Sequence, residues 1–408
     1  MIGYPRLVRL NPNIPWKTRG NGALAFQIGG GYGERTLIGE IDRKKIISYK
    51  KKRYDKKIPS GILNSISTIL HEQSRLSDQN TNPGFVILKD KPPYSLYQRA
   101  VRSIVEIEDV IELLRSKNAQ YILLKNGRGI IGATSAIAWS PERAGRTYEL
   151  ITYREPARWG TKRIVDEDTV KEMDRLYPTT FDNYDYENRH NRIKPNSPCP
   201  ILYGIRGVQP EELLKAYKHV KSEDIDSWLI FETNQGTDDH ITKSKINQIK
   251  PYHSVKIKGE IVKEPITIKG GHVIVQIKDD TDMIDCAAYE PTKQFRNIIR
   301  QLIPGDRIEV YGGVREYPLT INIEKIRVLR LTKQMIKMEN PICKPCNKHM
   351  KSIGKNQGYR CIICGRKKDK PVIKEKKRGL KSKFYEVPIC ARRHLSKPVK
   401  LITKPSQK

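Results

Sequence analysis

The sequence has 408 residues, enough for about two to four domains, and a formal net charge of +32. This excess of positive charge points to a polyanionic partner, and the 37% of hydrophobic residues suffices for several small cores. No apolar run approaches the ~20 residues of a membrane span, and no signal peptide is expected. The composition argues against a membrane protein, a secreted disulfide scaffold and a wholly disordered chain, and it favours a cytoplasmic location.

The positive charge is concentrated towards the end of the sequence. Residues 331–408 contain 23 Lys and Arg against 4 acidic residues. Such a run can be a solvated, partly disordered extension. We favour contact with nucleic acid phosphates and release of counterions, because this segment also carries a cysteine motif and follows an already basic body.

The first 139 residues alternate short strands and helices. Strands are expected at 6–10 and 23–28, on either side of a loop at 11–22 that is rich in turn-forming residues. Residues 29–33, which include four glycines, are expected to form a flexible connector. The other expected elements are helices at 59–73, 107–116 and 130–139 and strands at 85–88 and 121–125.

The alternation continues to about residue 245 and predicts α/β or α+β architecture. The expected elements are strands at 148–153, 201–205 and 228–233 and helices at 165–176 and 210–220.

Near Lys250 the pattern changes to successive β-type stretches. Five strands with a helix before the fourth are the layout of an OB-fold barrel, and another small barrel is the alternative. The strands are expected at 254–262, 267–277, 283–289, 307–314 and 320–328, and the helix at 292–302.

Two Cys-x-x-Cys pairs form the strongest local motif. Fourteen residues separate the pairs, and the ligands would be Cys343, Cys346, Cys361 and Cys364. Four thiolates close a tetrahedral site, so the spacing predicts a structural zinc ion in a zinc ribbon. Disulfides are the alternative, which the absence of a secretory pattern disfavours.

Two loops combine glycine with basic residues. Glycines let backbone amides approach a phosphate, and an arginine can add a bidentate contact. The first loop lies between a strand and a helix, and without other evidence an ordinary turn is the better interpretation there. For the second loop, phosphate binding and a basic turn are equally good. The residues are Asn126, Gly127, Arg128 and Gly129 in the first loop and Lys17, Arg19, Gly20 and Asn21 in the second.

A polar cluster follows the strand expected at 228–233. Asp238 and Asp239 could hold a cationic amine by charge-assisted hydrogen bonds, at a strand end where α/β folds often bind ligands. The alternative is a turn with solvated acids. Two further clusters, around Asp182 and Arg206, are each more typical of structure than of catalysis when taken alone.

These segments match one family in order along nearly the whole sequence. The matching stretches are 3–22 (GYPRLVRLNPNIPWKTRGNG), 126–133 (NGRGIIGA), 180–185 (TFDNYD), 197–207 (SPCPILYGIRG), 233–241 (TNQGTDDHI), 270–272, 286–292, 312–315, the four cysteines and 385–398 (YEVPICARRHLSKP). Together they resemble the archaeal tRNA(Ile) 2-agmatinylcytidine synthetases.

The resemblance implies an α+β multidomain architecture. A kinase-like α/β domain would be interleaved with a ferredoxin-like domain, and an OB-fold barrel and a zinc ribbon with a basic tail would follow. The expected boundaries are 1–56 and 140–200 for the kinase-like domain, 57–139 and 201–248 for the ferredoxin-like domain, 249–332 for the barrel and 333–408 for the ribbon and tail.

The resemblance also implies a reaction that uses ATP, presumed Mg²⁺ and agmatine. The carbonyl oxygen of the wobble cytidine is phosphorylated, and the primary amine of agmatine then displaces this phosphorylated oxygen. The modified tRNA reads AUA. The implied tRNA contacts are the anticodon loop and the acceptor stem. The residues implied to be catalytic are Asp182, Arg206, Asp238 and Asp239, and those implied to bind ATP are the eight residues of the two glycine loops.

One departure concerns the start of the sequence. In the family, an Asp-Asp-Thr-Asp segment and a phospho-accepting threonine precede the strand that matches residues 4–10, and here the sequence begins next to that strand. Three explanations are open: a start placed too late, a separate polypeptide that supplies the segment, or a chain that binds RNA without catalysis. We expect the first, because Lys17, Arg128 and Arg206 are present.

Overall fold

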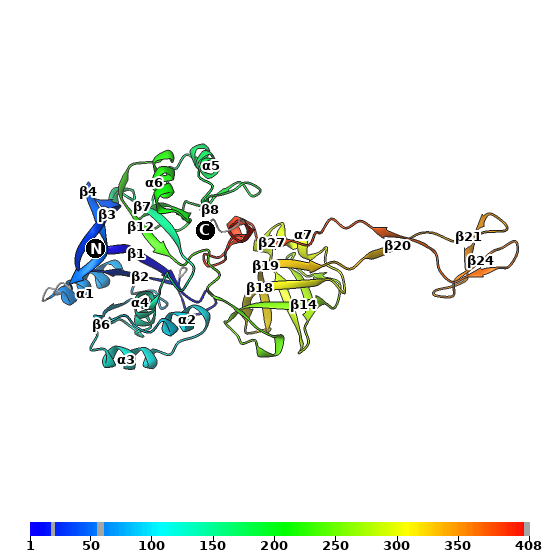
Figure 1. The fold of residues 1–408 in the computed structure, drawn as a ribbon, viewed down its shortest axis with the longest axis horizontal. Coiled ribbons are helices and arrows are strands. Elements are labelled where there is room, and N and C mark those ends of the chain that lie inside the picture. Colours follow the sequence, from blue (N-terminus) through cyan, green and yellow to red (C-terminus); the bar gives the residue numbers. More distant parts are fainter. Residues whose placement is uncertain (18–20, 55–60, 404–408) are drawn as a thin grey trace.

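The computed structural model describes residues 1–17, 21–54 and 61–403 (Figure 1). An N-terminal body is joined to a β-barrel, and a long arm leads from the barrel to a small distal domain. Among the described residues, no helix combines the length and the apolar character required to cross a bilayer.

The N-terminal body is built on an eight-stranded sheet with the order β2-β1-β4-β3-β12-β7-β11-β8. Strand β7 (Thr147–Arg154) is buried almost throughout because β12 (Ile225–Thr233) and β11 (Ile201–Gly207) pair with its two edges. The other strands of this sheet are β1 (Ile2–Arg9), β2 (Gly22–Gln27), β3 (Gly30–Ile41), β4 (Lys44–Tyr54) and β8 (Thr180–Phe181).

Helices flank this sheet on two sides (Figure 1). Helices α5 (Glu167–Leu176) and α6 (Pro210–His219) lie on one side, and the Asp166 side chain caps α5 by accepting two backbone N–H groups. The other side holds α1 (Ile62–Gln73), α2 (Tyr94–Arg102), α3 (Ile107–Ser116), α4 (Gly129–Ala138) and the strand pair β5 (Gly84–Ile87) and β6 (Gln120–Leu123). A second short pair is β9 (Tyr184–Asp185) with β10 (His190–Asn191).

The expectation of a flexible connector at 29–33 is wrong. Strand β3 begins at Gly30 and pairs with β4 in a long antiparallel hairpin. A Cβ on Gly30 would lie 2.4 Å from the Tyr54 ring, and one on Gly31 would lie 2.5 Å from Tyr49. These glycines therefore make room for tyrosine rings on the partner strand, which a reading of local flexibility does not capture.

The predicted barrel is confirmed. Strand β14 (Ser254–Ile261) pairs with both β18 (Arg307–Arg315) and β16 (Val273–Lys278), so the sheet closes around a core that includes Ile257 and Val275. The expected helix before the fourth strand is the short α7 (Phe295–Ile299). The remaining barrel strands are β13 (Ile241–Lys243), β15 (Ile266–Thr267), β17 (Met283–Ala288) and β19 (Thr320–Arg330).

Strands β20 (Gln334–Glu339) and β26 (Val372–Lys376) form the antiparallel arm, whose side chains are almost all exposed. At its far end the cysteines lie among the short strands β21 (Ile342–Cys343), β22 (Lys348–His349), β23 (Lys351–Ser352), β24 (Tyr359–Arg360) and β25 (Lys367–Lys368).

After the arm the chain returns to the centre of the molecule (Figure 1). Strand β27 (Phe384–Glu386) pairs with β19, and α8 (Val399–Thr403) follows. Leu395 and Ser396 are buried where the N-terminal body meets the barrel. Residues 384–398, which we name the return segment, belong to the expected basic tail and are part of the folded centre.

Candidate functional site

A small cationic pocket lies where strand β1 ends. It has a volume of about 210 Å³ and draws residues from the N-terminal loop and from the return segment. The Nε atom of Arg9 is buried there and has no hydrogen-bond partner among the described residues. The residues lining the pocket are Arg9, Leu10, Pro12, Lys17, Asn21, Arg393, His394 and Leu395.

The electrostatics of this cationic pocket favour an anion. Burial and the neighbouring Arg393 lower the pKa of Lys17. Burial, and then Arg9, Arg206 and Arg192, hold the pKa of His394 well below its ordinary value, so its imidazole is neutral. Cations that depress one another's pKa values gain from a bound phosphate, which offsets their repulsion.

A chain of alternating charges lies close to this pocket. Arg206 donates to Glu149 at 3.3 Å and lies 3.5 Å from Asp182. Asp182 also pairs with Arg392, which contacts Glu386 at 2.6 Å. The structure thus brings together two residues implied by the resemblance, Asp182 and Arg206, and holds both in ion pairs.

Asp238 joins three parts of the protein. Its carboxylate accepts hydrogen bonds from Lys325 of the barrel, at 2.6 and 2.9 Å, and from the backbone amide of Lys397, at 2.7 Å. The Lys325 side chain is fully buried, whereas 19% of the Asp238 side chain is exposed. These contacts satisfy Asp238 within the protein, so its arrangement is that of a structural anchor. A role towards a substrate amine stays a prediction.

Asp239 belongs to a separate polar network. It accepts a hydrogen bond from the Tyr97 hydroxyl at 2.7 Å, and Arg102 donates to its backbone carbonyl. Burial raises the pKa of the Asp239 carboxyl. Tyr97 in turn accepts from Asn234, which exchanges two hydrogen bonds with the backbone of Arg9. This network fixes the end of β1, where the cationic pocket begins.

The glycines of the loop before α4 have structural reasons to be glycine. Gly127 has a φ of +74°, a left-handed conformation that side chains disfavour. A Cβ on Gly129 would lie 2.3 Å from the carbonyl oxygen of Asn82, so the helix start packs tightly against the chain before β5. A phosphate is not needed to explain these two residues, and such a role for them stays a prediction.

The polar residues of the same loop face their own surroundings. Asn126 accepts a hydrogen bond from the amide of Arg128 at 3.0 Å. The Arg128 guanidinium lies 5.3 Å from the centre of the Trp16 ring and donates to Val105. The two glycine loops are therefore neighbours, but only Lys17 and Asn21 line the cationic pocket. The predicted residues Arg19 and Gly20 lie outside the described residues.

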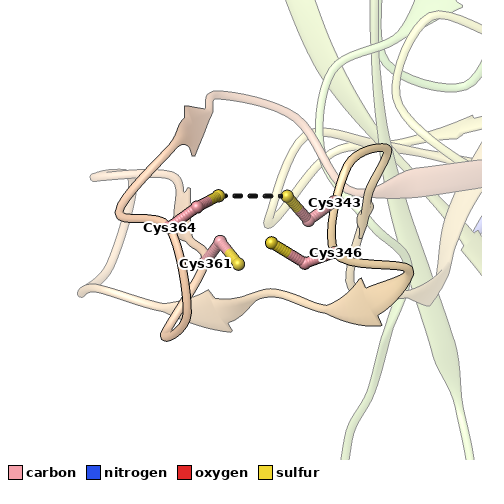
Figure 2. Close-up of side chains that lie close together, drawn as sticks. All are labelled: Cys343, Cys346, Cys361 and Cys364. Carbon is pink, nitrogen blue, oxygen red and sulfur yellow. Dashed lines mark hydrogen bonds between the residues drawn. The ribbon is translucent and has the colours of Figure 1, made fainter.

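The four predicted zinc ligands converge in the distal domain (Figure 2). Their Sγ atoms all lie within 4.8 Å of one another, and those of Cys343 and Cys364 are 3.5 Å apart. Tetrahedral zinc with ~2.3 Å Zn–S bonds requires sulfurs about 3.8 Å apart, so the cluster fits this ion. Backbone amides of Cys364 and Ile363 lower the pKa of Cys361 to about 6, which favours the thiolate that zinc binds.

Sequence reasoning did not single out four residues of the site: Arg9, Glu149, Arg393 and His394. Three of them lie inside stretches that carried the family resemblance, 3–22 and 385–398, so position within those stretches was the available signal. Glu149 had no such signal, because it lies outside those stretches in a central strand where apolar and polar residues are mixed.

Family models cover most of the chain. Models described as the TiaS TCKD domain and the TiaS FLD domain match residues 1–126 and 127–240. An OB-fold nucleic acid binding domain matches 255–329, and a TiaS C-terminal zinc ribbon domain matches 340–380. Each model matches one uninterrupted range, whereas the kinase-like and ferredoxin-like domains expected from the sequence each combine two separate ranges. Those expected boundaries stay a prediction.

The chain is also similar to curated proteins named tRNA(Ile2) 2-agmatinylcytidine synthetase TiaS. The protein of Methanocaldococcus jannaschii is 43% identical over 98% of this chain and 91% of its own length. That of Archaeoglobus fulgidus is 40% identical over 98% and 89%. A solved TiaS–tRNA(Ile2)–ATP complex matches with a TM-score of 0.82 and 38% identity, over 100% of this chain and 90% of that one. A TiaS–tRNA(Ile2)–AMPCPP–agmatine complex matches with 0.78 and 36%, over 100% and 89%.

Proposed function

This chain belongs to the tRNA(Ile2) 2-agmatinylcytidine synthetase family, and we propose that it attaches agmatine to the wobble cytidine of the minor isoleucine tRNA in an ATP-dependent reaction in the cytoplasm. The observation that carries this proposal in the structure is the cationic pocket. The Nε atom of Arg9, which has no hydrogen-bond partner among the described residues, suits a phosphate group together with Lys17 and Arg393 beside it. A solved TiaS complex contains tRNA(Ile2) and ATP, and both of these ligands carry phosphate groups of the kind that this pocket suits.

In the proposed reaction, the cytidine carbonyl oxygen accepts a phosphoryl group, which converts this oxygen into part of a leaving group. The primary amine of agmatine then attacks the carbon that carries this oxygen, and the oxygen departs as part of the phosphate. Positioning and electrostatic stabilisation of the phosphates supply most of the catalysis in phosphoryl transfer. We assign this stabilisation to the side chains of Arg9, Lys17 and Arg393; the neutral His394 contributes no charge to it.

Two carboxylates of the chain of alternating charges next to this pocket already have partners. Glu149 and Asp182 are each paired with an arginine, and the cysteines form the only cluster of potential metal ligands among the described residues. Mg²⁺ prefers oxygen ligands and commonly takes one or two carboxylates together with substrate phosphates, so either carboxylate would have to exchange its arginine for the metal. The requirement for Mg²⁺ stays a prediction.

Labelled agmatine incorporation into a tRNA(Ile2) transcript tests the proposal. The variants Arg9→Met and Arg393→Met should lower the rate by about 100-fold or more, as loss of one preorganised donor to a developing charge does. The exposed Arg175 on α5 supplies the control Arg175→Met, which should retain activity. Wild-type protein that binds this tRNA but incorporates no agmatine with ATP present would favour the non-catalytic RNA-binding alternative.

A further inference from the structure

A second, larger cleft opens beside the cationic pocket. This joint cleft has a volume of about 440 Å³ and lies between the N-terminal loop and the barrel. It shares Pro12, Lys17 and Arg393 with the cationic pocket, so the two hollows are continuous along one wall. The residues lining the joint cleft are Pro12, Asn13, Ile14, Pro15, Lys17, Tyr252, Val314, Arg315, Glu316, Tyr317, Asn322 and Arg393.

Two aromatic residues, Tyr252 and Tyr317, line this cleft, and Trp16 lies between two of its lining residues, Pro15 and Lys17. The Trp16 ring lies next to the Tyr252 ring, with centroids 6.4 Å apart, and 42% of Trp16 is exposed. Tyr317, in the barrel, is 85% exposed. Exposed aromatic rings beside lysine and arginine are the usual platform for unpaired nucleobases.

The backbone of Tyr252 is held in an unfavourable conformation. Its φ of +66° is left-handed, which is rare and unfavourable for an aromatic residue. The side-chain amides of Asn11 and Asn13 both donate to the Tyr252 carbonyl, and its own amide donates to Val314 at 2.9 Å. The surrounding structure therefore maintains this ring position against local preference, which is typical of functional sites.

The cleft also contains an unsatisfied polar atom. The Oδ1 atom of Asn322 is buried and has no hydrogen-bond partner within the described part of the chain. An amide acceptor left without a partner loses free energy unless a ligand donates to it. The exocyclic amino group of a nucleobase is a donor of the required kind.

We propose that the joint cleft binds one unstacked base of single-stranded RNA, adjacent to the nucleotide that reaches the cationic pocket. The phosphodiester between the two nucleotides would lie over Lys17 and Arg393, which both hollows share. This inference rests on the proposed function in taking the tRNA as ligand. An RNA base is favoured over the adenine of ATP because an OB-fold barrel forms one wall and the rim at Tyr317 faces solvent.

The variant Tyr252→Asn is the sharpest test, because asparagine tolerates a left-handed backbone and the substitution therefore removes the ring without adding strain. The matched control is Tyr252→Phe, which keeps the ring and loses only the hydroxyl contact with Glu316. We expect Tyr252→Asn to weaken tRNA binding on the order of tenfold, and Tyr252→Phe to bind normally. ATP affinity, measured without tRNA, should be the same in all three proteins.

A fluorescent base identifies the bound nucleotide. With 2-aminopurine placed at one anticodon-loop position at a time, we expect quenching at one position by wild type and Tyr252→Phe but not by Tyr252→Asn. Unchanged tRNA affinity and quenching in Tyr252→Asn would overturn the inference, as would a loss of ATP affinity alone. Both readouts are independent of agmatine transfer, so they can fail while the proposed function stands; wild type without tRNA affinity would contradict both.

Discussion

The substitution Asp238→Asn removes the carboxylate that faces a fully buried ammonium group. Lys325 Nζ would lose its only charged hydrogen-bond partner among the described residues and keep uncharged ones: the carbonyl oxygen of Lys397 at 2.8 Å, the amide oxygen of the new asparagine, and the Tyr311 ring, whose centroid is 5.5 Å away. An uncompensated buried charge costs about 3–5 kcal/mol. The reverse substitution, Lys325→Met, should cost less, about 2 kcal/mol, because Asp238 keeps the Lys397 amide and is 19% exposed to water.

The two substitutions are coupled if this pair is an anchor. The double variant Asp238→Asn plus Lys325→Met should then be more stable than the sum of the single losses, by about 2 kcal/mol. Calorimetry provides the measurement. For a folded unit of about 150–250 residues, a loss of 3–5 kcal/mol in the free energy of unfolding lowers the transition midpoint by about 10 °C. An Asp90→Asn variant, in an exposed loop before α2, serves as the control.

The same variants distinguish the anchor from the amine-binding role first considered for Asp238. An anchor predicts that the agmatine KM changes little at a temperature where the variants are folded. If Asp238→Asn instead kept full thermal stability and raised the agmatine KM strongly, the reasoning from buried charge would be refuted.

Three further measurements follow from the structure. Removal of zinc by a chelator, or Cys361→Ser, should unfold the distal domain and abolish bound zinc while the barrel's far-UV signal persists, because few buried residues besides the cysteines hold that domain. His394→Gln should flatten the pH dependence of stability. Burial holds the pKa of His394 low in the folded protein, so below about pH 6.5 only the unfolded chain binds a proton at this histidine. The free energy of unfolding of wild type should therefore fall by up to ~1.4 kcal/mol for each pH unit below that point. A variant with the wild-type slope would contradict the buried neutral imidazole. Gly313→Ala would place a Cβ 2.3 Å from Asn13 Oδ1 and should cost about 1–3 kcal/mol and weaken tRNA binding; unchanged denaturant midpoints would count against the close contact.

The barrel and the zinc cluster could be predicted because their signals are local. Buried and less buried residues alternate along β16, and two residues separate the cysteines of each pair. Helix α3 lies at its predicted boundaries for the same reason, since its apolar residues repeat at helical spacing. These features depend on neighbours within a few residues.

The cationic pocket could not be predicted in this way, because its walls come from opposite ends of the chain. Arg9 and Lys17 lie near the start of the sequence, whereas Arg393 and His394 follow the barrel and the arm. The hairpin of β3 and β4 was missed for a related reason: Gly30 and Gly31 are determined by rings on the partner strand, which local composition does not reveal.

The return segment changes how the RNA-binding role of the basic C-terminal region must be tested. Deleting residues 332–408 would remove the distal domain, but it would also remove Arg393 from the cationic pocket and Lys397 from the Asp238 anchor. A loss of tRNA affinity would then have two causes. Excising 340–371 and closing the arm between β20 and β26 spares the return segment, because these strands already pair. If the distal domain contacts tRNA phosphates, this excision should reduce the slope of log K against log salt while ATP affinity is unchanged. If the slope were unchanged, the electrostatic contacts with tRNA would lie instead at the barrel and the joint cleft.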